Sequence, residues 1–417
     1  MSLISRLILA FACLIPCQVH LSVHGQVQLA PSSSGIQPGS PQQQNDELKN
    51  VEEMTFDEIV DEIRANEAEI NRLYSSIPVG FPNAHRKFMA KIKGIRDRSK
   101  LLKSEVKNSA IRSYQKDPNG NPKAATIVFN EMLAKLEPQS PESSFDPQGA
   151  LELGNILLDS DLPLDNSAAV NFFGVSYQTF RACFALQDFE KANRLLGQIE
   201  KNGTRLLPQI REQLEDAKRK FDREVTIRRL ESQTDDLPLA KLETSEGVIT
   251  VELFEDHAPQ AVANFINLVE RQFYDGLDFF YVRPGEVAQT GCPKGDGTSD
   301  AGYQIPCECD KGQIRHHLAG TVSMVNQGKD TGSSQLFFSY QPKSDRDGRY
   351  TVFGRIVEGM DVLYRLKRYQ PSMSSGSQLE PSKLTRASIV RKRGHVYAPT
   401  RLARQSTQVD QASNSDQ

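Results

Sequence analysis

Residues 239–254 read LAKLETSEGVITVELF and mark a change of pattern in this chain of 417 residues. From Ile249 through Val251 to Leu253, apolar residues alternate with polar ones. Because successive side chains of a strand point to opposite faces, the alternation predicts strands with one buried face, and a β domain therefore begins here. The domain is expected to continue with helices over 258–272 and 359–366 and a last strand over 384–391.

The part of the chain before this β domain has a helical pattern, from about residue 47 to residue 232. In FDEIVDEIRANEAEINRLYSSI, four apolar residues recur at helical spacing and share one face: Ile59, Ile63, Ile70 and Leu73. Segments that combine Pro with Gly, Asn or Ser interrupt the pattern, which predicts several packed helices with short connections. These breaks lie at 78–82, 117–122 and 138–147.

One helical segment, TFRACFALQDFEKANRLLGQIEKNG, resembles a single unit of a tetratricopeptide array. Small residues, Ala182 and Ala185, precede a turn near Gln187. Such arrays need about three units to be stable, and no period near 34 residues recurs in this chain. We therefore expect a plain helical hairpin over 176–202, with a true repeat domain as the alternative. The helical domain is a candidate site for a protein partner.

Residues 1–25 have the features of a secretory signal peptide. Arg6 precedes the apolar run Leu7–Ile15, which is too short to span a bilayer, and small residues precede Gln26. Cleavage before Gln26 predicts an exported protein, either periplasmic or extracellular. Lipid attachment at Cys17 is the alternative.

The remaining composition excludes several classes of partner. No later stretch approaches the roughly 20 apolar residues of a transmembrane helix, so no membrane span is expected. The net charge of -3, from 50 basic and 53 acidic residues, gives no field that would attract nucleic acid. Two polar segments cannot bury enough apolar surface to fold and predict a disordered tether over 26–46 and a disordered tail over 398–417.

Cysteine and histidine residues of the β domain raise the question of disulfides and metals. Cys292 and the pair Cys307 and Cys309 flank a Gly-rich loop, and both a bridge that closes this loop and free thiols remain open. Three cysteines lack the paired spacing of a zinc ribbon, so no metal site is expected. His316 and His317 are interpreted as the beginning of a strand, on which neighbours would face opposite ways and could not share an ion.

Four segments follow one another in the β domain. They are GVITVELFEDHAPQAVANF (247–265), PGEVAQTG (284–291), GTVSMVNQGKDTGSSQLFFS (320–339) and DGRYTVFGRIVEGMDVL (347–363). Their order and gaps resemble the cyclophilins, a family of peptidyl-prolyl isomerases, over residues 237–397. The resemblance implies an antiparallel β-barrel of eight strands with two capping helices, here preceded by an all-α region. It also implies rotation about the X-Pro bonds of proline-containing polypeptides, without a cofactor.

This reaction sets clear chemical requirements. Rotation about an X-Pro amide has a barrier of about 18–20 kcal/mol because the C–N bond has double-bond character. An isomerase therefore needs an apolar pocket for the proline ring, groups that hold the flanking peptide, and a cation near the prolyl nitrogen. The resemblance assigns the peptide to Gln289, Asn326 and Gln335, and the pocket to Phe337 and Val287. Tyr350 stands where the family often has a histidine beside the pocket.

Departures from the family pattern fall on the same site. Tyr281 replaces the catalytic arginine, Glu286 and Arg346 replace apolar pocket residues, and Val325 replaces an alanine and narrows the neighbouring groove. Arg283 is a second candidate catalytic residue because on a strand it faces the same side as Tyr281, about 7 Å further along. Glu286 is expected to hold Arg283 in an ion pair or to face Arg346, which would itself supply a cation.

Two functions follow from this pattern. The first is a peptidyl-prolyl cis-trans isomerase for exported proteins, slowed by the replacement of the arginine. The second is a catalytically inactive cyclophilin fold that binds proline-containing peptides. A purely structural envelope component, which would need no pocket at all, is a third and weaker hypothesis.

Overall fold

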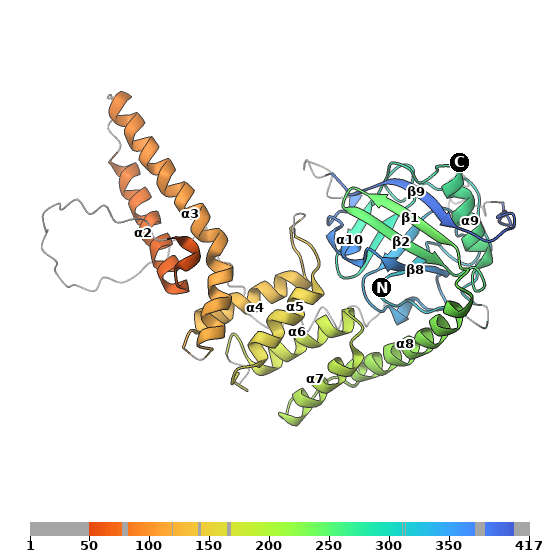
Figure 1. Ribbon diagram of the computed structural model, residues 1–417, viewed down its shortest axis with the longest axis horizontal. Helices are drawn as coiled ribbons and strands as arrows, with labels where there is room; N and C mark the ends of the chain where they lie inside the picture. The colour runs from red at the N-terminus through yellow and green to blue at the C-terminus, as the bar shows by residue number, and fades with distance from the viewer. Residues whose placement is uncertain are drawn as a thin grey trace, which may run out of the picture. The chain divides into compact units, whose positions relative to one another are not determined.

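The computed structural model describes residues 50–76, 82–118, 120–140, 143–164, 168–310, 312, 314–371 and 380–403 (Figure 1). The predicted signal peptide, the tether and residues 404–417 of the predicted tail lie outside these residues. The chain forms two compact units. The first comprises Met1–Ser109 with Ser167–Ala169, and the second comprises Ala110–Asn166 with Val170–Gln417. Within the described residues, no helix is both long enough and apolar enough to cross a membrane.

The first unit is built on a pair of long helices, α2 (Phe56–Ser75) and α3 (Pro82–Lys116), of which the last turns of α3 belong to the second unit. A capping box fixes the start of α2, because Thr55 and Glu58 satisfy each other's backbone N–H groups. A short 3-10 turn, η1 (Val51–Glu53), precedes it. The predicted apolar face is confirmed at Ile59 and Leu73, which are buried.

The helices of the second unit begin where the sequence places Pro and capping residues. They are α4 (Pro122–Leu136), α5 (Pro147–Leu158), α6 (Phe172–Ala185), α7 (Phe189–Lys201) and α8 (Pro208–Thr234). Successive helices pack against each other, and α6 with α7 forms the predicted hairpin. The turn between them is tight because Gln187 adopts a left-handed conformation and Asp188 caps α7. Cys183 is a buried free thiol in their shared core.

The β domain is a single curled antiparallel sheet. Its strands are β1 (Leu239–Thr244), β2 (Gly247–Leu253), β3 (Leu277–Asp278), β4 (Tyr281–Arg283), β5 (Val287–Thr290), β6 (Thr321–Met324), β7 (Leu336–Ser339), β8 (Val352–Glu358) and β9 (Lys383–Arg391). The order is β3-β9-β1-β2-β8-β6-β7-β5-β4 and the pairings are antiparallel. Because only residues 279–280 separate β3 from β4, the two ends of this order meet.

The curled antiparallel sheet that follows the helices confirms the predicted architecture, an all-α region followed by a β-barrel domain, although the sheet has nine strands rather than the expected eight. The predicted inward face of β2 is also confirmed, since Ile249, Val251 and Leu253 are at most 1% exposed. Two helices accompany the barrel, α9 (Pro259–Glu270) and α10 (Met360–Arg365), together with the 3-10 turn η2 (Ser344–Arg346).

Two predictions about the β domain need correction. Cys307 and Cys309 form a disulfide with each other, and Cys292 is a buried free thiol, so the proposed bridge across the Gly-rich loop is wrong. The predicted tail begins too early, because the Thr400 N–H donates to Gln260 and Leu402 pairs with Gln304 of the barrel domain. Composition alone placed these residues in a tail because they are polar. Their order comes from backbone hydrogen bonds, which composition does not reveal.

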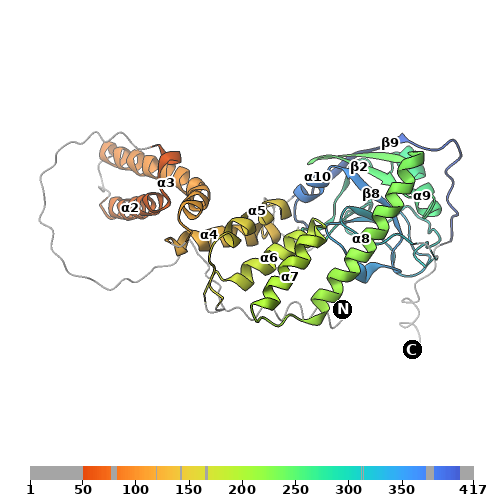
Figure 2. The ribbon, with the colours of Figure 1, turned by 60° about the horizontal axis from the view of Figure 1, so that its bottom comes forward.

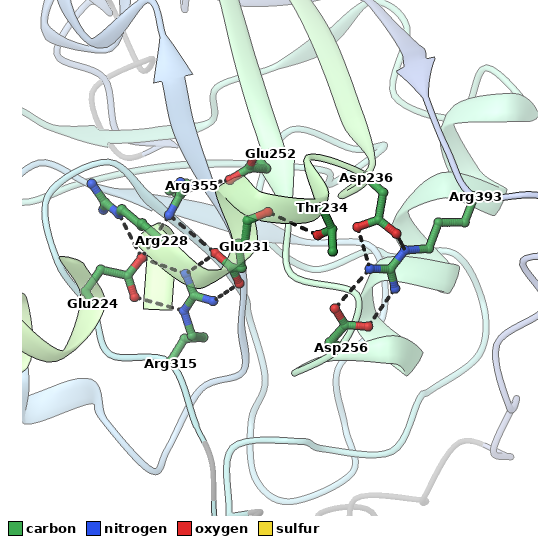
Figure 3. Close-up of polar contacts among 10 residues, drawn as sticks. All are labelled: Glu224, Arg228, Glu231, Thr234, Asp236, Glu252, Asp256, Arg315, Arg355 and Arg393. Carbon is green, nitrogen blue, oxygen red and sulfur yellow. Dashed lines mark hydrogen bonds and ion pairs between the residues drawn. The ribbon is translucent and has the colours of Figure 1, made fainter. Parts of the chain in front are cut away.

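A buried arginine attaches helix α8 to the barrel (Figure 3). The side chain of Arg315 is 1% exposed, and its guanidinium reaches Glu224 and Glu231 of α8, with Nη2 of Arg315 lying 2.6 Å from Oε1 of Glu224. The same guanidinium lies over the ring of Phe254, 3.6 Å from its centroid. Arg355 of β8 also contacts Glu224, at 3.2 Å. Because a buried charge is costly unless fully paired, these groups hold one another in a single arrangement.

A second contact joins the helical segment to the barrel at the turn between β4 and β5. Phe145 packs against Tyr340 and Tyr364, with ring centroids 5.8 and 5.2 Å away. At the turn itself, Gly285 adopts a positive φ of 76°. A Cβ at Gly285 would lie 3.0 Å from the Phe145 ring, so glycine meets both the conformation and the close approach.

Replacing Arg315 with Met should lower the free energy of unfolding of the full chain by about 3–5 kcal/mol, because two buried carboxylates lose their shortest ion pairs and keep only the longer ones with Arg355 and Arg228. Urea denaturation measures this loss. The matched control is Arg211→Met, whose half-exposed pair with Glu200 joins α8 to α7, and which should cost less than about 1 kcal/mol. Equal losses in the two variants would contradict the account of Arg315.

The same cluster makes stability depend on pH. Burial alone would raise the pKa of Glu224, but the hydrogen bonds and charge of Arg315, with the charge of Arg228, outweigh it and lower the pKa to about 2. A lowered carboxyl pKa contributes stability above its ordinary value and loses it as the pH falls towards the folded value. The stability difference between wild type and Glu224→Gln should therefore shrink by about 3 kcal/mol between about pH 5 and pH 2. A difference that stays constant over this range would refute the linkage.

Candidate active site on the barrel

Three of the predicted site residues form one row across neighbouring strands. Tyr281 on β4 is paired with Gln289 on β5, and Gln289 is paired with Phe337 on β7. Directly opposite residues of antiparallel strands project to the same face, so their side chains are neighbours. The next row on this face, two residues along, begins with Arg283 and Val287. The sheet register therefore brings residues from three separate sequence motifs into one patch.

The ring of Phe337 is the centre of this patch and is only 2% exposed. The guanidinium carbon of Arg346 lies over the ring, 4.8 Å from its centroid. The imidazole of His317 stacks parallel to the ring at 5.8 Å, and the ring of Tyr350 meets it edge-on at 5.4 Å. Phe337 thus belongs to an aromatic group of three rings, and the cation of Arg346 lies against it.

Three residues could supply a hydrogen bond or a cation, namely Tyr281, Arg283 and Arg346, and their surroundings differ. Tyr281 is partly buried, and its hydroxyl has no hydrogen-bond partner among the described residues. Arg283 is 49% exposed on its side chain and pairs with Glu286, with 3.3 Å between Nη2 and Oε1, as expected. The alternative pairing of Arg346 with Glu286 is absent from the described ion pairs, because Arg346 turns towards Phe337 instead.

Of the residues predicted to hold a peptide, Val287 and Gln289 lie on β5, and Val325 and Asn326 directly follow β6. Gln289 is partly buried, and its side-chain amide has no partner within the described part of the chain. Val287 is buried at 3% exposure, and Val325 is half-buried beside Asn326. Gln289 and Tyr281 are therefore adjacent polar groups whose hydrogen bonds remain available to a bound chain.

Two amide side chains are already engaged within the protein. Gln335 donates both amide hydrogens, to the carbonyl oxygens of Gly297 and Ser299 at 2.9 Å each. Asn326 donates to the carbonyl oxygen of Arg349 at 2.8 Å. The side-chain oxygens of Gln335 and Asn326 are consequently the atoms left to accept from a peptide N–H. A cavity of about 420 Å³ borders Asn326 and Tyr350 on this side of the domain.

Comparison with known proteins agrees with this geometry. The model for the family "Cyclophilin type peptidyl-prolyl cis-trans isomerase/CLD" matches residues 239–389. A peptidyl-prolyl cis-trans isomerase of Synechococcus elongatus is 47% identical over 130 residues, which are 31% of this chain and 88% of that protein. The chain belongs to the cyclophilin family.

Other relatives extend the same result. Peptidyl-prolyl cis-trans isomerase B of Bacillus subtilis is 42% identical over 132 residues, or 32% of this chain and 87% of that protein. A solved cyclophilin-type isomerase of Cryptosporidium parvum is 23% identical, with a TM-score of 0.34, and the match covers 38% of this chain and 99% of that one. The predicted enzyme class, an isomerase, is the class for which the Synechococcus and Bacillus relatives are named.

This cyclophilin differs from the sequence-based expectation at His316 and His317. The two residues precede β6 in a loop, so they do not alternate as neighbours on a strand would. Both imidazoles instead contact the carboxylate of Asp347, with Nδ1 of His316 at 3.1 Å and Nδ1 of His317 at 2.8 Å. The interpretation of this pair as the beginning of a strand is therefore wrong.

The charge state of this cluster follows from its burial. Burial opposes ionisation of Asp347, but hydrogen bonds from His316, His317 and Lys220 outweigh it and hold the pKa of the carboxyl well below its usual range. Burial also lowers the pKa of His317, and the neighbouring carboxylate only partly offsets this. The imidazole of His317 is fully buried, and its Nε2 has no hydrogen-bond partner in the described residues. A neutral imidazole in contact with Phe337 is the state that this environment favours.

Sequence reasoning missed the roles of His317 and Asp347 in this site. Asp347 was visible only as part of a family motif, and His317 only as one of a histidine pair. Their meeting depends on a contact between residues separated by 30 positions. The signal that could have indicated it is the unusual apolar-to-charged change at Arg346, the residue before Asp347.

Proposed function

We propose that the cyclophilin domain catalyses cis-trans rotation about X-Pro bonds of exported polypeptides, at a rate reduced by the presence of Tyr281. The observation that carries this proposal is the row Tyr281, Gln289 and Phe337, with the guanidinium of Arg346 over the Phe337 ring. It combines an aromatic pocket, free hydrogen-bonding groups and a cation within one patch. These are the three requirements of the reaction.

The chemistry needs no covalent intermediate. A proline ring held against Phe337, with its flanking peptide bound by Gln289, would place the prolyl nitrogen near the polar residues of the row. A hydrogen bond to that nitrogen weakens the amide resonance and so lowers the rotational barrier. The phenol of Tyr281 can donate only a neutral hydrogen bond, roughly half as strong as a charged one.

Arg346 is the better candidate for the missing cation. Arg283 is half-exposed and is already paired with Glu286, and such surface pairs hold a charge loosely in water. The Arg346 guanidinium lies against the pocket ring itself. It must swing aside to admit a proline ring, and it then stays close enough to interact with the bound peptide. This required movement is a physical reason for a slow enzyme.

A second candidate function is favoured by the same contact. Because Phe337 is only 2% exposed and Arg346 lies over it, little of the ring is accessible in this conformation. A domain that binds proline-containing segments and catalyses nothing would keep Gln289, Gln335 and Asn326 and would tolerate Tyr281. The two functions differ in turnover and share the peptide site.

The location and the domain organisation complete the proposal. A signal peptide over residues 1–25 supports export, with lipid attachment at Cys17 as the alternative. The domains proposed are the helical domain over 47–232 and the cyclophilin domain over 237–397. The helical domain would contact a protein partner, while the barrel domain takes the proline-containing chain.

Exchange spectroscopy on the peptide Ala-Ala-Pro-Phe tests the function. Wild type should catalyse slow exchange between its cis and trans forms, Phe337→Ala should abolish it, and Tyr281→Arg should raise the rate by about tenfold or more, since one preorganised donor is worth about 10²–10³. Phe273→Ala, on the loop after α9, is the matched aromatic control. Peptide binding without exchange in wild type, with exchange appearing only in Tyr281→Arg, would favour the binding scaffold.

Substitution by Leu separates the two arginines as sources of the cation. Arg346→Leu should lower kcat by about tenfold to a hundredfold and leave KM nearly unchanged, because leucine preserves the apolar wall while the charge is lost. Arg283→Leu serves as the matched variant and should change kcat by less than about threefold. A larger fall in Arg283→Leu than in Arg346→Leu would transfer the role to Arg283.

A further inference from the structure

We propose that helix α8 is part of the working active site, in which Lys220 acts as a positioning residue for Arg346 and His317 through the carboxylate of Asp347. The inference rests on the proposed isomerase function and assigns to the helical segment a role in that reaction. Figure 2 shows α8 running beside the barrel, and hydrogen bonds join the two.

The carboxylate of Asp347 contacts groups of both the helix and the barrel. Its Oδ2 lies 2.8 Å from Nζ of Lys220, on α8, and 3.1 Å from Nδ1 of His316. Its Oδ1 accepts hydrogen bonds from the backbone N–H and from Nδ1 of His317, both at 2.8 Å. The side chains of Asp347 and Lys220 are 11% and 18% exposed. A single, largely buried carboxylate therefore connects the helix with two barrel residues.

Asp347 is connected to the residues that contact Phe337. Asp347 directly follows Arg346, whose guanidinium lies over Phe337. His317, fixed by Asp347, stacks on the same ring, and Tyr350 meets it edge-on three residues after Asp347. The side chains of Arg346, His317 and Tyr350 all contact Phe337. His317 is hydrogen-bonded to Asp347, and Arg346 and Tyr350 lie within three residues of it in the sequence. Displacement of Asp347 would move them together.

Several contacts hold helix α8 in place against the barrel. Lys220 is also held by Asp216, one turn earlier on α8, whose Oδ2 lies 2.5 Å from its Nζ, and α8 packs against η2. Arg223 contacts Nε2 of His316 at 3.2 Å. Further along α8, Glu224 and Glu231 hold the buried Arg315 (Figure 3). The helix meets the loop 315–317 and the segment 344–347 along several consecutive turns, so it can position both precisely.

The pKa of His317 is a measurable property that should change if Lys220 positions Asp347. His317 faces Asp347, Arg346 and Asp345 from its own domain, and Lys220 approaches the same carboxylate from α8. Loss of the lysine cation leaves Asp347 with the imidazoles as its partners and removes a positive charge beside them. Protonation of His317 then becomes easier, so its pKa should rise.

The test uses the full-length chain and compares Lys220→Met with Lys220→Arg and with Lys218→Met. Lys218 is the matched control because it pairs with Asp222 and Glu190 of the helices and makes no ion pair with the barrel within the described residues. Lys220→Met should lower kcat for the peptide Ala-Ala-Pro-Phe about tenfold with little change in KM, since misplaced groups lose transition-state contacts. Lys220→Arg should restore most of the rate, and Lys218→Met should match wild type.

Titration of the His317 ring by NMR provides the second measurement, which does not depend on turnover. In Lys220→Met the pKa of His317 should rise, whereas Lys218→Met should leave it unchanged. Equal rates and equal His317 titration in Lys220→Met and Lys218→Met would overturn the positioning role while the isomerase function stands. Absence of exchange in wild type would instead refute the isomerase function, and the His317 titration together with affinity for the same peptide would then decide the positioning role alone.

Discussion

The burial of one guanidinium group, that of Arg315, constrains the rest of the second unit. A cation with 1% exposure must be fully paired, and both of its carboxylate partners come from helix α8. The helix is therefore fixed along the barrel, and the residues that follow Arg315 are fixed with it. These are His316 and His317, which reach the carboxylate behind the pocket. One electrostatic requirement thus places helix α8 and the histidine residues beside Phe337.

The candidate site that this arrangement supports combines the strand pairing of the barrel with a charged side chain, that of Arg346, against Phe337. Strand pairing still brings Gln289 and Phe337 together, because register depends on backbone hydrogen bonds and buried faces rather than on the pocket side chains. In this chain the guanidinium of Arg346 lies over the Phe337 ring, and Tyr281 is paired with Gln289 on the neighbouring strand. In the function proposed above, Arg346 supplies the cation and Tyr281 a neutral hydrogen-bond donor.

The sequence pattern predicted the features that depend on residues close together in the chain. Alternation around Ile249 gave the inward face of β2, and the Pro-containing breaks gave the helix boundaries, because both reflect the period of the backbone. The disulfide and the histidine pair were not predictable in this way. The partner of Arg315 on α8, Glu224, is 91 residues away, and no periodic pattern relates the two. Family resemblance selected the candidate site residues, but the position of Arg346 over Phe337 required the three-dimensional structure.

Amide hydrogen exchange of the full-length chain tests most directly the central claim that α8 and the barrel form one unit. The account predicts that amides of α8 around Lys220 and Glu224 open with the same free energy as those of strands β6 and β7, because the helix leaves only when the barrel unfolds. Exchange of these helix amides at a much lower opening free energy, as in a helix that frays independently of an intact barrel, would contradict it.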